Sequence, residues 1–224
     1  MPFFIEMSNK RILIIGGGDE GFRRAEKYCK TGAEIIVYSK SFDDGLMKLS
    51  SDNRVKLVVG DVEDEERLER LIEDVDIVMV ALDEKNYNYK IEKLARRHRR
   101  LLNLANDAEE TEVVVPIDSK IGSIRIALTT EGKSSMVARE ALDKITKFLE
   151  GERELLDLAE IMYKVKRIVR KNIPDYKKRF EIYRKIFNNA SLREALRSGD
   201  HRRAVEIYSK ILMDEGLDPG EVKV

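Results

Sequence analysis

The chain has 224 residues, enough for one large domain or two small ones. Its 42 basic and 42 acidic side chains cancel to a formal net charge of +0, so no global field favours nucleic acid. The single cysteine, Cys29, excludes an intramolecular disulfide framework, and no apolar run approaches the roughly 20 residues of a membrane helix. We therefore expect a cytoplasmic protein with no nucleic-acid or membrane partner.

A glycine-rich turn near the N-terminus organises the chain. A buried strand is predicted over Arg11–Ile15, followed by Gly16-x-Gly18-x-x-Gly21 and a helix over residues 22–31. In a dinucleotide-binding βαβ unit, such glycines permit the tight turn, the approach of backbone amides to a pyrophosphate, and close packing of helix on strand. The helix N-terminus adds N–H groups and a positive dipole end. The pattern favours a nucleotide site over a plain turn.

The second predicted strand, Glu34–Tyr38, is followed by Ser39, Lys40 and Ser41. A classical NAD site has an acidic residue here that binds the ribose hydroxyls. Either the serine hydroxyls bind the ribose or the lysine tolerates a phosphate, so the choice between NAD and NADP stays open.

Strands and helices alternate from residue 10 to about 112. Further strands are predicted at Val55–Val59, Asp76–Leu82 and Leu101–Leu104, with helices at 63–72 and 83–97. This alternation predicts an α/β fold with a Rossmann-like, doubly wound parallel sheet, which makes residues 1–112 an NAD-binding domain. We interpret the basic run Arg96–Arg100 as a solvated helix end favoured by the dipole.

The pattern changes after residue 112. Strands predicted at Glu112–Ile117 and Ile124–Thr129 form a hairpin-like pair, and a helix follows over Met136–Glu150. Two strands and one helix cannot bury their own faces, so residues 113–151 are expected to form a dimerisation segment. Residues 152–224 are predicted to be a C-terminal helical domain, with helices at Leu155–Val169, Tyr176–Phe187, Ser191–Arg197 and Asp200–Glu215.

Three segments in order carry a family resemblance. They are Gly16-Gly-Gly-Asp-Glu-Gly-Phe-Arg-Arg-Ala25, then Leu102-Asn-Leu-Ala-Asn-Asp107 followed by Val113-Val-Val-Pro116, and finally Ile126 to Arg139. Together they resemble the N-terminal module of siroheme synthases, that is, precorrin-2 dehydrogenase, sometimes bifunctional with sirohydrochlorin ferrochelatase. The resemblance implies a homodimeric enzyme of siroheme and porphyrin biosynthesis that oxidises precorrin-2 to sirohydrochlorin with NAD.

The resemblance also implies site residues. Besides the three glycines, it places Asp19 and Glu20 in the pyrophosphate turn and Lys40 and Ser41 at the adenosine end. The segment that lines the tetrapyrrole cleft contains Thr130, Lys133, Ser134 and Arg139. Precorrin-2 carries many carboxylates, which the basic side chains among these can neutralise by charge-assisted hydrogen bonds.

The expected catalytic position departs from the family. The family's key aspartate falls on Asn106, with Asp107 as its neighbour. An amide cannot act as a general base near neutral pH, whereas a carboxylate can. If the loop shifts by one residue, Asp107 takes this role; otherwise dehydrogenation relies on positioning the substrate. Chelation would suffer more, because it requires removal of pyrrole protons, and the ferrochelatase activity stays open.

No metal site is predicted, because His98, His201 and Cys29 do not form a cluster of ligands. An alternative to the enzyme is a non-catalytic NAD-sensing regulatory module of the potassium-transport type. Gly60-Asp61 followed by an acidic helix resembles those domains. They usually keep the acidic residue after the second strand, which is absent here.

Overall fold

The computed structural model describes residues 2–107 and 109–221 and consists of two compact units. The first unit runs to Val115 and includes Glu131–Lys133. The second comprises Pro116–Thr130 and the chain from Ser134 onward. Across the described ranges, no helix combines the length and apolar character needed to cross a membrane.

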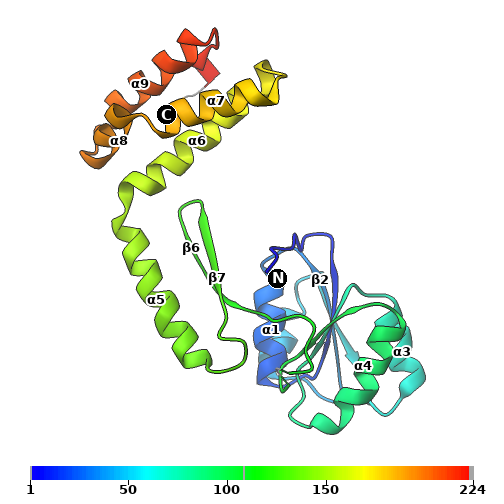
Figure 1. Cartoon of the computed structure of the whole chain (residues 1–224). Coiled ribbons are helices and arrows are strands. Elements are labelled where there is room, and N and C mark those ends of the chain that lie inside the picture. The colour runs from blue at the N-terminus through cyan, green and yellow to red at the C-terminus, as the bar shows by residue number, and fades with distance from the viewer. Residues whose placement is uncertain (1, 108, 222–224) are drawn as a thin grey trace. The chain divides into compact units, whose positions relative to one another are not determined.

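The first unit is built on a five-stranded parallel sheet (Figure 1). Its strand order is β3-β2-β1-β4-β5, so the chain reverses direction across the sheet between β3 and β4. The strands are β1 (Arg11–Ile15), β2 (Glu34–Ser39), β3 (Val55–Val59), β4 (Ile77–Val80) and β5 (Leu101–Leu104). The helices are α1 (Asp19–Cys29), α2 (Asp44–Leu49), α3 (Glu65–Glu73) and α4 (Asn88–Arg97), with a 3-10 turn η1 (Lys85–Tyr87). The predicted Rossmann-like sheet is confirmed.

Both faces of this sheet are covered, which is why its strands are apolar at consecutive positions. Ile12 and Ile14 of β1 pack in one apolar cluster with residues of α1 and α2. The alternate residues Leu13 and Ile15 pack in a second cluster with α3 and α4, which lie on the opposite side of the sheet from α1 in Figure 1. An apolar cluster on each face therefore fixes the sheet between two layers of helices.

The second unit joins a hairpin to five helices. Its elements are β6 (Ile117–Ile121), β7 (Ile124–Leu128), α5 (Ser135–Gly151), α6 (Arg153–Asn172), α7 (Tyr176–Phe187), α8 (Ala190–Arg197), α9 (His201–Asp214) and the 3-10 turn η2 (Pro219–Glu221). The strands pair antiparallel, and Gly122 has the positive φ of 56° that the two-residue turn requires. Helices α6–α9 share one apolar core, and Asp175, Asn189 and Asp200 cap the helices that follow them.

The structure corrects two local predictions. The strand predicted at Glu112–Ile117 is wrong, because the hairpin begins only at Ile117. Instead, the Val113 amide donates to the Leu102 carbonyl at 2.9 Å, and Val115 packs against the core of the first unit. The short helix α2 was not predicted. Leu46 is buried and Leu49 packs against the same cluster, and a six-residue helix is too short to show a helical period.

Candidate functional site

The glycine-rich turn joins β1 to α1 at the carboxyl edge of the sheet. Gly16 has φ +119°, and a Cβ there would collide with the Ala81 carbonyl at the end of β4. A Cβ on Gly21 would collide with the Gly16 carbonyl, so this glycine permits helix and strand to approach. At Gly18 a Cβ would meet nothing within 4 Å. The protein thus leaves no room for a side chain at Gly16 or Gly21, whereas there is open space beside Gly18.

The N-terminus of α1 has the character of an anion site. Gly18 is its N-cap residue, and no side chain caps the helix there. The acidic residues of the first turn, Asp19 and Glu20, form ion pairs with Arg23 and Arg24 one turn later. These pairs offset the negative charges that would otherwise oppose an anion beside the amides. The backbone, and not the Asp19 and Glu20 carboxylates, is therefore the part suited to hold a pyrophosphate.

The loop after β2 lies directly against the glycine turn. The Asp43 amide donates to the Gly17 carbonyl at 2.8 Å, and a Cβ on Gly17 would collide with the Ser41 carbonyl. The sequence pattern did not assign a role to Gly17, because its constraint comes from a loop more than 20 residues away. The structure thus brings the predicted Ser41 to the turn that contains Gly16 and Gly18.

Lys40 in this loop already has a partner. Its Nζ lies 2.8 Å from Asp61 Oδ2, and the hydrogen bond from Lys40 holds the pKa of Asp61 below its usual range. The same contact raises the pKa of Lys40. Asp61 is fixed in turn, since its Oδ1 accepts from the Glu63 amide at 3.1 Å. Its backbone carbonyl accepts from the buried Tyr38 hydroxyl at 2.8 Å.

Asn106 ties together the loops that follow β4 and β5. Its Nδ2 donates to the Leu82 carbonyl at 2.9 Å, and its Oδ1 accepts from Asn88 Nδ2 at 2.8 Å. Both ends of the amide are therefore engaged by the protein. Asn106 therefore links the loop after β4 to the loop after β5, the edge strand of the sheet, and its amide is not a base near neutral pH.

Asp107 follows at the same edge and is ionised. Lys85 Nζ lies 3.2 Å from Asp107 Oδ2, and this hydrogen bond is the main cause that lowers the pKa of Asp107. The side chain is 22% exposed, so it is partly shielded but reachable. A carboxylate is thus present at neutral pH beside Asn106, the residue at which the family resemblance places the catalytic aspartate.

A buried polar bridge behind the site was not assigned by sequence reasoning. Arg24 of α1 donates to the Oδ1 of Asn103, which is only 4% exposed in the middle of β5. Asn103 Nδ2 donates to the Val113 carbonyl, and the Thr111 hydroxyl accepts from the Leu104 amide at 3.0 Å. These contacts anchor α1 and residues 111–113 to β5. The signal in the sequence was one asparagine within an otherwise apolar strand.

The predicted substrate residues lie around the start of α5. The Thr130 hydroxyl donates to the Ser134 carbonyl at 2.9 Å and accepts from the Ser134 amide at 3.0 Å. The Ser134 hydroxyl caps α5 by accepting from the Val137 amide at 3.2 Å. Lys133 and Arg139 are exposed. The two hydroxyl groups therefore shape the turn, and the two cations are available to a ligand.

The residues at this edge fit a dinucleotide. The uncapped N-terminus of α1, the open position at Gly18 and the adjoining Ser39–Ser41 loop meet where an open parallel sheet binds such ligands. Within residues 2–107 and 109–221 there is no group of three or more His, Cys, Asp or Glu side chains able to hold a metal ion.

Comparisons with known proteins agree with this geometry. A family described as "Putative NAD(P)-binding" matches residues 3–117, about half of the chain. The chain belongs to this family. A protein of Methanocaldococcus jannaschii named "Putative precorrin-2 dehydrogenase" is 28% identical over 201 residues, which cover 88% of this chain and 94% of that relative.

Longer relatives match as well. The siroheme synthase of Pseudoalteromonas translucida is 24% identical over 224 residues, or 100% of this chain and 46% of the relative. The chain thus spans about half the length of that enzyme. The solved structure of "SirC, precorrin-2 dehydrogenase" has a TM-score of 0.67 at 16% identity, covering 94% of this chain and 98% of that one, and shares its fold. The resemblance to the siroheme synthase N-terminal family is confirmed.

Proposed function

We propose that this chain is a precorrin-2 dehydrogenase that oxidises precorrin-2 to sirohydrochlorin with NAD, in the synthesis of siroheme or another tetrapyrrole. The observation that carries the proposal is the glycine turn at an uncapped helix N-terminus, in a chain similar to a protein named for this activity over nearly its whole length. NAD, when bound, supplies the acceptor for the hydride. The cytoplasm is the expected compartment.

The contact between Lys40 and Asp61 supports NAD over NADP. A 2′-phosphate near Lys40 would have to break an ion pair of 2.8 Å and lie beside the Asp61 carboxylate. The ribose hydroxyls of NAD require no such change, and the Ser39 and Ser41 hydroxyls are suited to bind them. Asp61, which follows β3, thus supplies the negative charge that disfavours a 2′-phosphate.

Asp107 is the proposed general base. Loss of a hydride from precorrin-2 must be accompanied by loss of a proton, and a carboxylate can accept it whereas the amide of Asn106 cannot. The hydrogen bond from Lys85 lowers the pKa of Asp107, so the carboxylate is ionised near neutral pH but less basic than an ordinary aspartate. Asn106 contributes by fixing the loop through Leu82 and Asn88. Asp107 is thus the proposed base, and Asn106 is the proposed positioning residue.

Binding of the substrate carboxylates is proposed to fall to Lys133 and Arg139, which are exposed and basic. Thr130 and Ser134 contribute by holding the turn and capping α5. Removing either hydroxyl would therefore weaken substrate binding indirectly, by changing the conformation of this turn.

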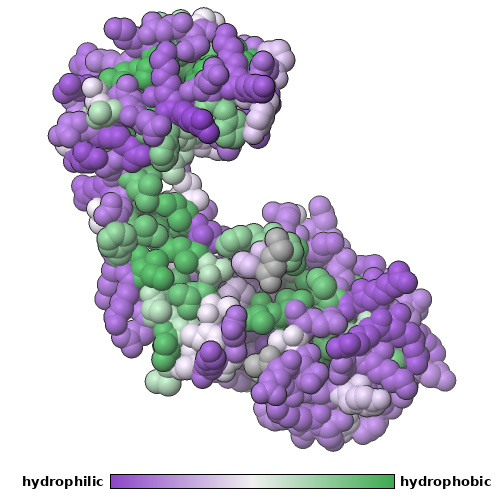
Figure 2. Space-filling model, in the orientation of Figure 1, coloured by the Kyte–Doolittle hydropathy of each residue, from purple (hydrophilic) through white to green (hydrophobic). Residues whose placement is uncertain are grey.

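A homodimer through residues 113–151 is also proposed. An apolar stripe on α5 consists of Val137, Ile145 and Phe148, exposed by 58%, 39% and 67%, with Met136 beside it at 81%. Figure 2 shows apolar side chains gathered over α5. Exposed apolar side chains gathered on one helix face favour a protein interface there. Helices α6–α9 then form a helical part of the second unit with their own apolar core.

The experiment is an anaerobic assay of sirohydrochlorin formation by the parent protein, Asp107→Asn and Asn106→Ala. We expect turnover by the parent, a loss of at least about a hundredfold in kcat for Asp107→Asn, and a smaller loss for Asn106→Ala. Equal activity of the parent and Asp107→Asn would refute the proposed base. An inactive parent that still binds NAD would favour the regulatory alternative.

A second arm of the same assay adds Co²⁺ or Fe²⁺ as substrate to test for chelatase activity, which the relatives named siroheme synthase bring into question. Asn106→Asp restores the family's carboxylate at that position. Metal insertion by the variant alone would show that the amide at position 106 is what separates the two activities.

A further inference from the structure

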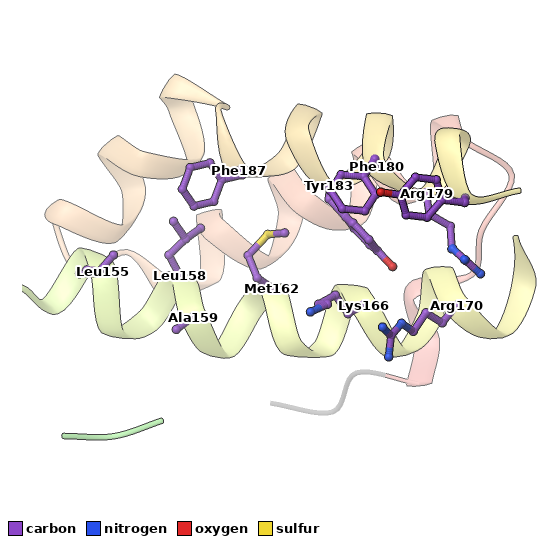
Figure 3. A pocket seen from close by; sticks show the side chains of 11 residues that line it. Leu155, Leu158, Ala159, Met162, Lys166, Arg170, Arg179, Phe180, Tyr183 and Phe187 are labelled. Carbon is purple, nitrogen blue, oxygen red and sulfur yellow. The ribbon is translucent and has the colours of Figure 1, made fainter. Parts of the chain in front are cut away.

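A cavity of about 450 Å³ lies between α6 and α7, away from the dinucleotide turn in sequence and in a different unit. This volume falls within the usual range of small-molecule sites. Figure 3 shows that its lining is divided along its length. Leu155, Leu158, Ala159 and Phe187 line one end, and Lys166, Arg170 and Arg179 line the other.

The wall formed by α7 is aromatic. Tyr176, Phe180 and Tyr183 follow one another at helical spacing, with ring centroids 4.8 Å and 5.9 Å apart. At the apolar end, the Arg193 guanidinium stacks over the Phe187 ring at 4.6 Å. Phe180 and Phe187 are nevertheless 45% and 44% exposed, so this helix presents large apolar surface that its own core does not cover.

The charged end contains cations only. No Asp or Glu lines the cavity, although acidic and basic residues are equal in number in the whole chain. The dipole of α6 favours a basic residue in its last turn, which explains Arg170. It does not explain Lys166, nearly two turns from the end of α6, or Arg179, which belongs to α7 and donates to the Ile173 carbonyl at 3.4 Å.

One polar group on the cavity wall has no hydrogen-bond partner among the described residues. The Tyr183 hydroxyl is buried and has no hydrogen-bond partner in the described part of the chain, and its ring lines the cavity between the apolar and the cationic ends. Buried hydroxyl groups almost always have a partner. An acceptor placed within the cavity would satisfy this hydroxyl and the cations together.

We propose that this cavity is a binding site for an elongated apolar molecule with a carboxylate at one end. The apolar body would lie on Leu158, Met162 and Phe180, and the carboxylate would face Lys166, Arg170 and the Tyr183 hydroxyl. A molecule with carboxylates around its whole rim, such as precorrin-2, does not match, because the apolar end would desolvate some of them. The site is therefore distinct from the proposed substrate site and does not depend on the proposed function.

The test uses the full chain and two probes, 8-anilinonaphthalene-1-sulfonate for an aromatic body and dodecanoate for an aliphatic one. The chain has no tryptophan, so Phe180→Trp places a single reporter on the cavity wall. We expect saturable binding of at least one probe, a change in the emission of this reporter, and no displacement by uroporphyrin. The probe that binds more tightly identifies the body as aromatic or aliphatic.

Charge variants assign the site. Lys166→Gln with Arg170→Gln is expected to weaken binding about tenfold or more. Lys164→Gln with Arg167→Gln, on the same helix but outside the lining, should leave it unchanged. Ala159→Phe, which fills the cavity, should abolish binding while the circular dichroism stays that of the parent. Equal probe affinities in all variants would overturn the proposal. So would emission from the tryptophan reporter that changes with protein concentration but not on addition of the probes.

Discussion

Replacing Asp61 with asparagine is expected to shift the cofactor preference towards NADP. The Asp61 carboxylate neutralises Lys40 at 2.8 Å, and an asparagine keeps the oxygen that accepts from the Glu63 amide while it removes the charge. The turn is therefore preserved, and Lys40 becomes free to bind a 2′-phosphate.

The magnitude follows from the contacts that change. One charge-assisted hydrogen bond from Lys40 to the phosphate replaces one repulsive carboxylate, which corresponds to a rise of about ten- to a hundredfold in kcat/KM for NADP. Because both side chains are substantially exposed, at 68% and 42%, the pair adds little to folding. Activity with NAD should stay within about twofold, and the thermal midpoint should not move.

The assay compares kcat/KM for the two cofactors in the parent, Asp61→Asn and Asp64→Asn. Asp64 caps α3, and asparagine is an equally good cap, so the control removes the same charge three residues later without freeing Lys40. Adding Lys40→Ala to Asp61→Asn should abolish the gain. The same ratio of NADP to NAD activity in Asp61→Asn and Asp64→Asn would refute the reasoning.

Three further predictions concern single side chains. Asn103→Leu keeps the branching at Cγ but removes the bonds to Arg24 and Val113, so urea denaturation should show a loss of about 2–4 kcal/mol in the free energy of unfolding. A loss below about 0.5 kcal/mol would contradict the bridge. Lys85→Met removes the main cause that lowers the pKa of Asp107, so this pKa should rise. Because a protonated carboxyl cannot act as a base, the acid limb of the pH profile of kcat/KM should move to higher pH. An acid limb at the same pH would show that Lys85 does not act on the base. Phe148→Lys places a charge on the apolar stripe of α5 and should convert a dimer to a monomer by light scattering; an unchanged mass would place the interface elsewhere.

The fold could be predicted wherever local pattern decides structure. The runs that became β1, β3 and β5 have the predicted bounds, since each is a short, mainly apolar run of strand length. Tyr176–Phe187 was also predicted at its observed bounds, because the Pro174-Asp175 pair that precedes it provides a start signal and Asp175 a cap.

Prediction failed where distant contacts override local pattern. Residues 113–115 are β-branched and predict a strand, but Val113 bonds to Leu102 and Val115 packs against the core of the first unit. Gly17 is constrained by the Ser41 carbonyl, which belongs to another loop. Such constraints have no signature within the segment itself.

In the candidate site, too, local features could be predicted and contacts between distant residues could not. The glycine turn was predictable from its residues and the elements on both sides of it. The partners of Lys40, Asn106 and Asp107 were not, because each comes from a different loop that the sheet brings to the same edge. The proposed preference for NAD rests on the partner of Lys40, and the proposed base rests on the partners of Asn106 and Asp107.

The central claim is most directly tested by recording NADH and sirohydrochlorin together during anaerobic incubation of the protein with precorrin-2 and NAD. The account predicts that both absorbances rise with equal amounts of the two products and that NADP supports much slower turnover. Formation of neither product with either cofactor, under conditions where the protein binds NAD, would contradict it.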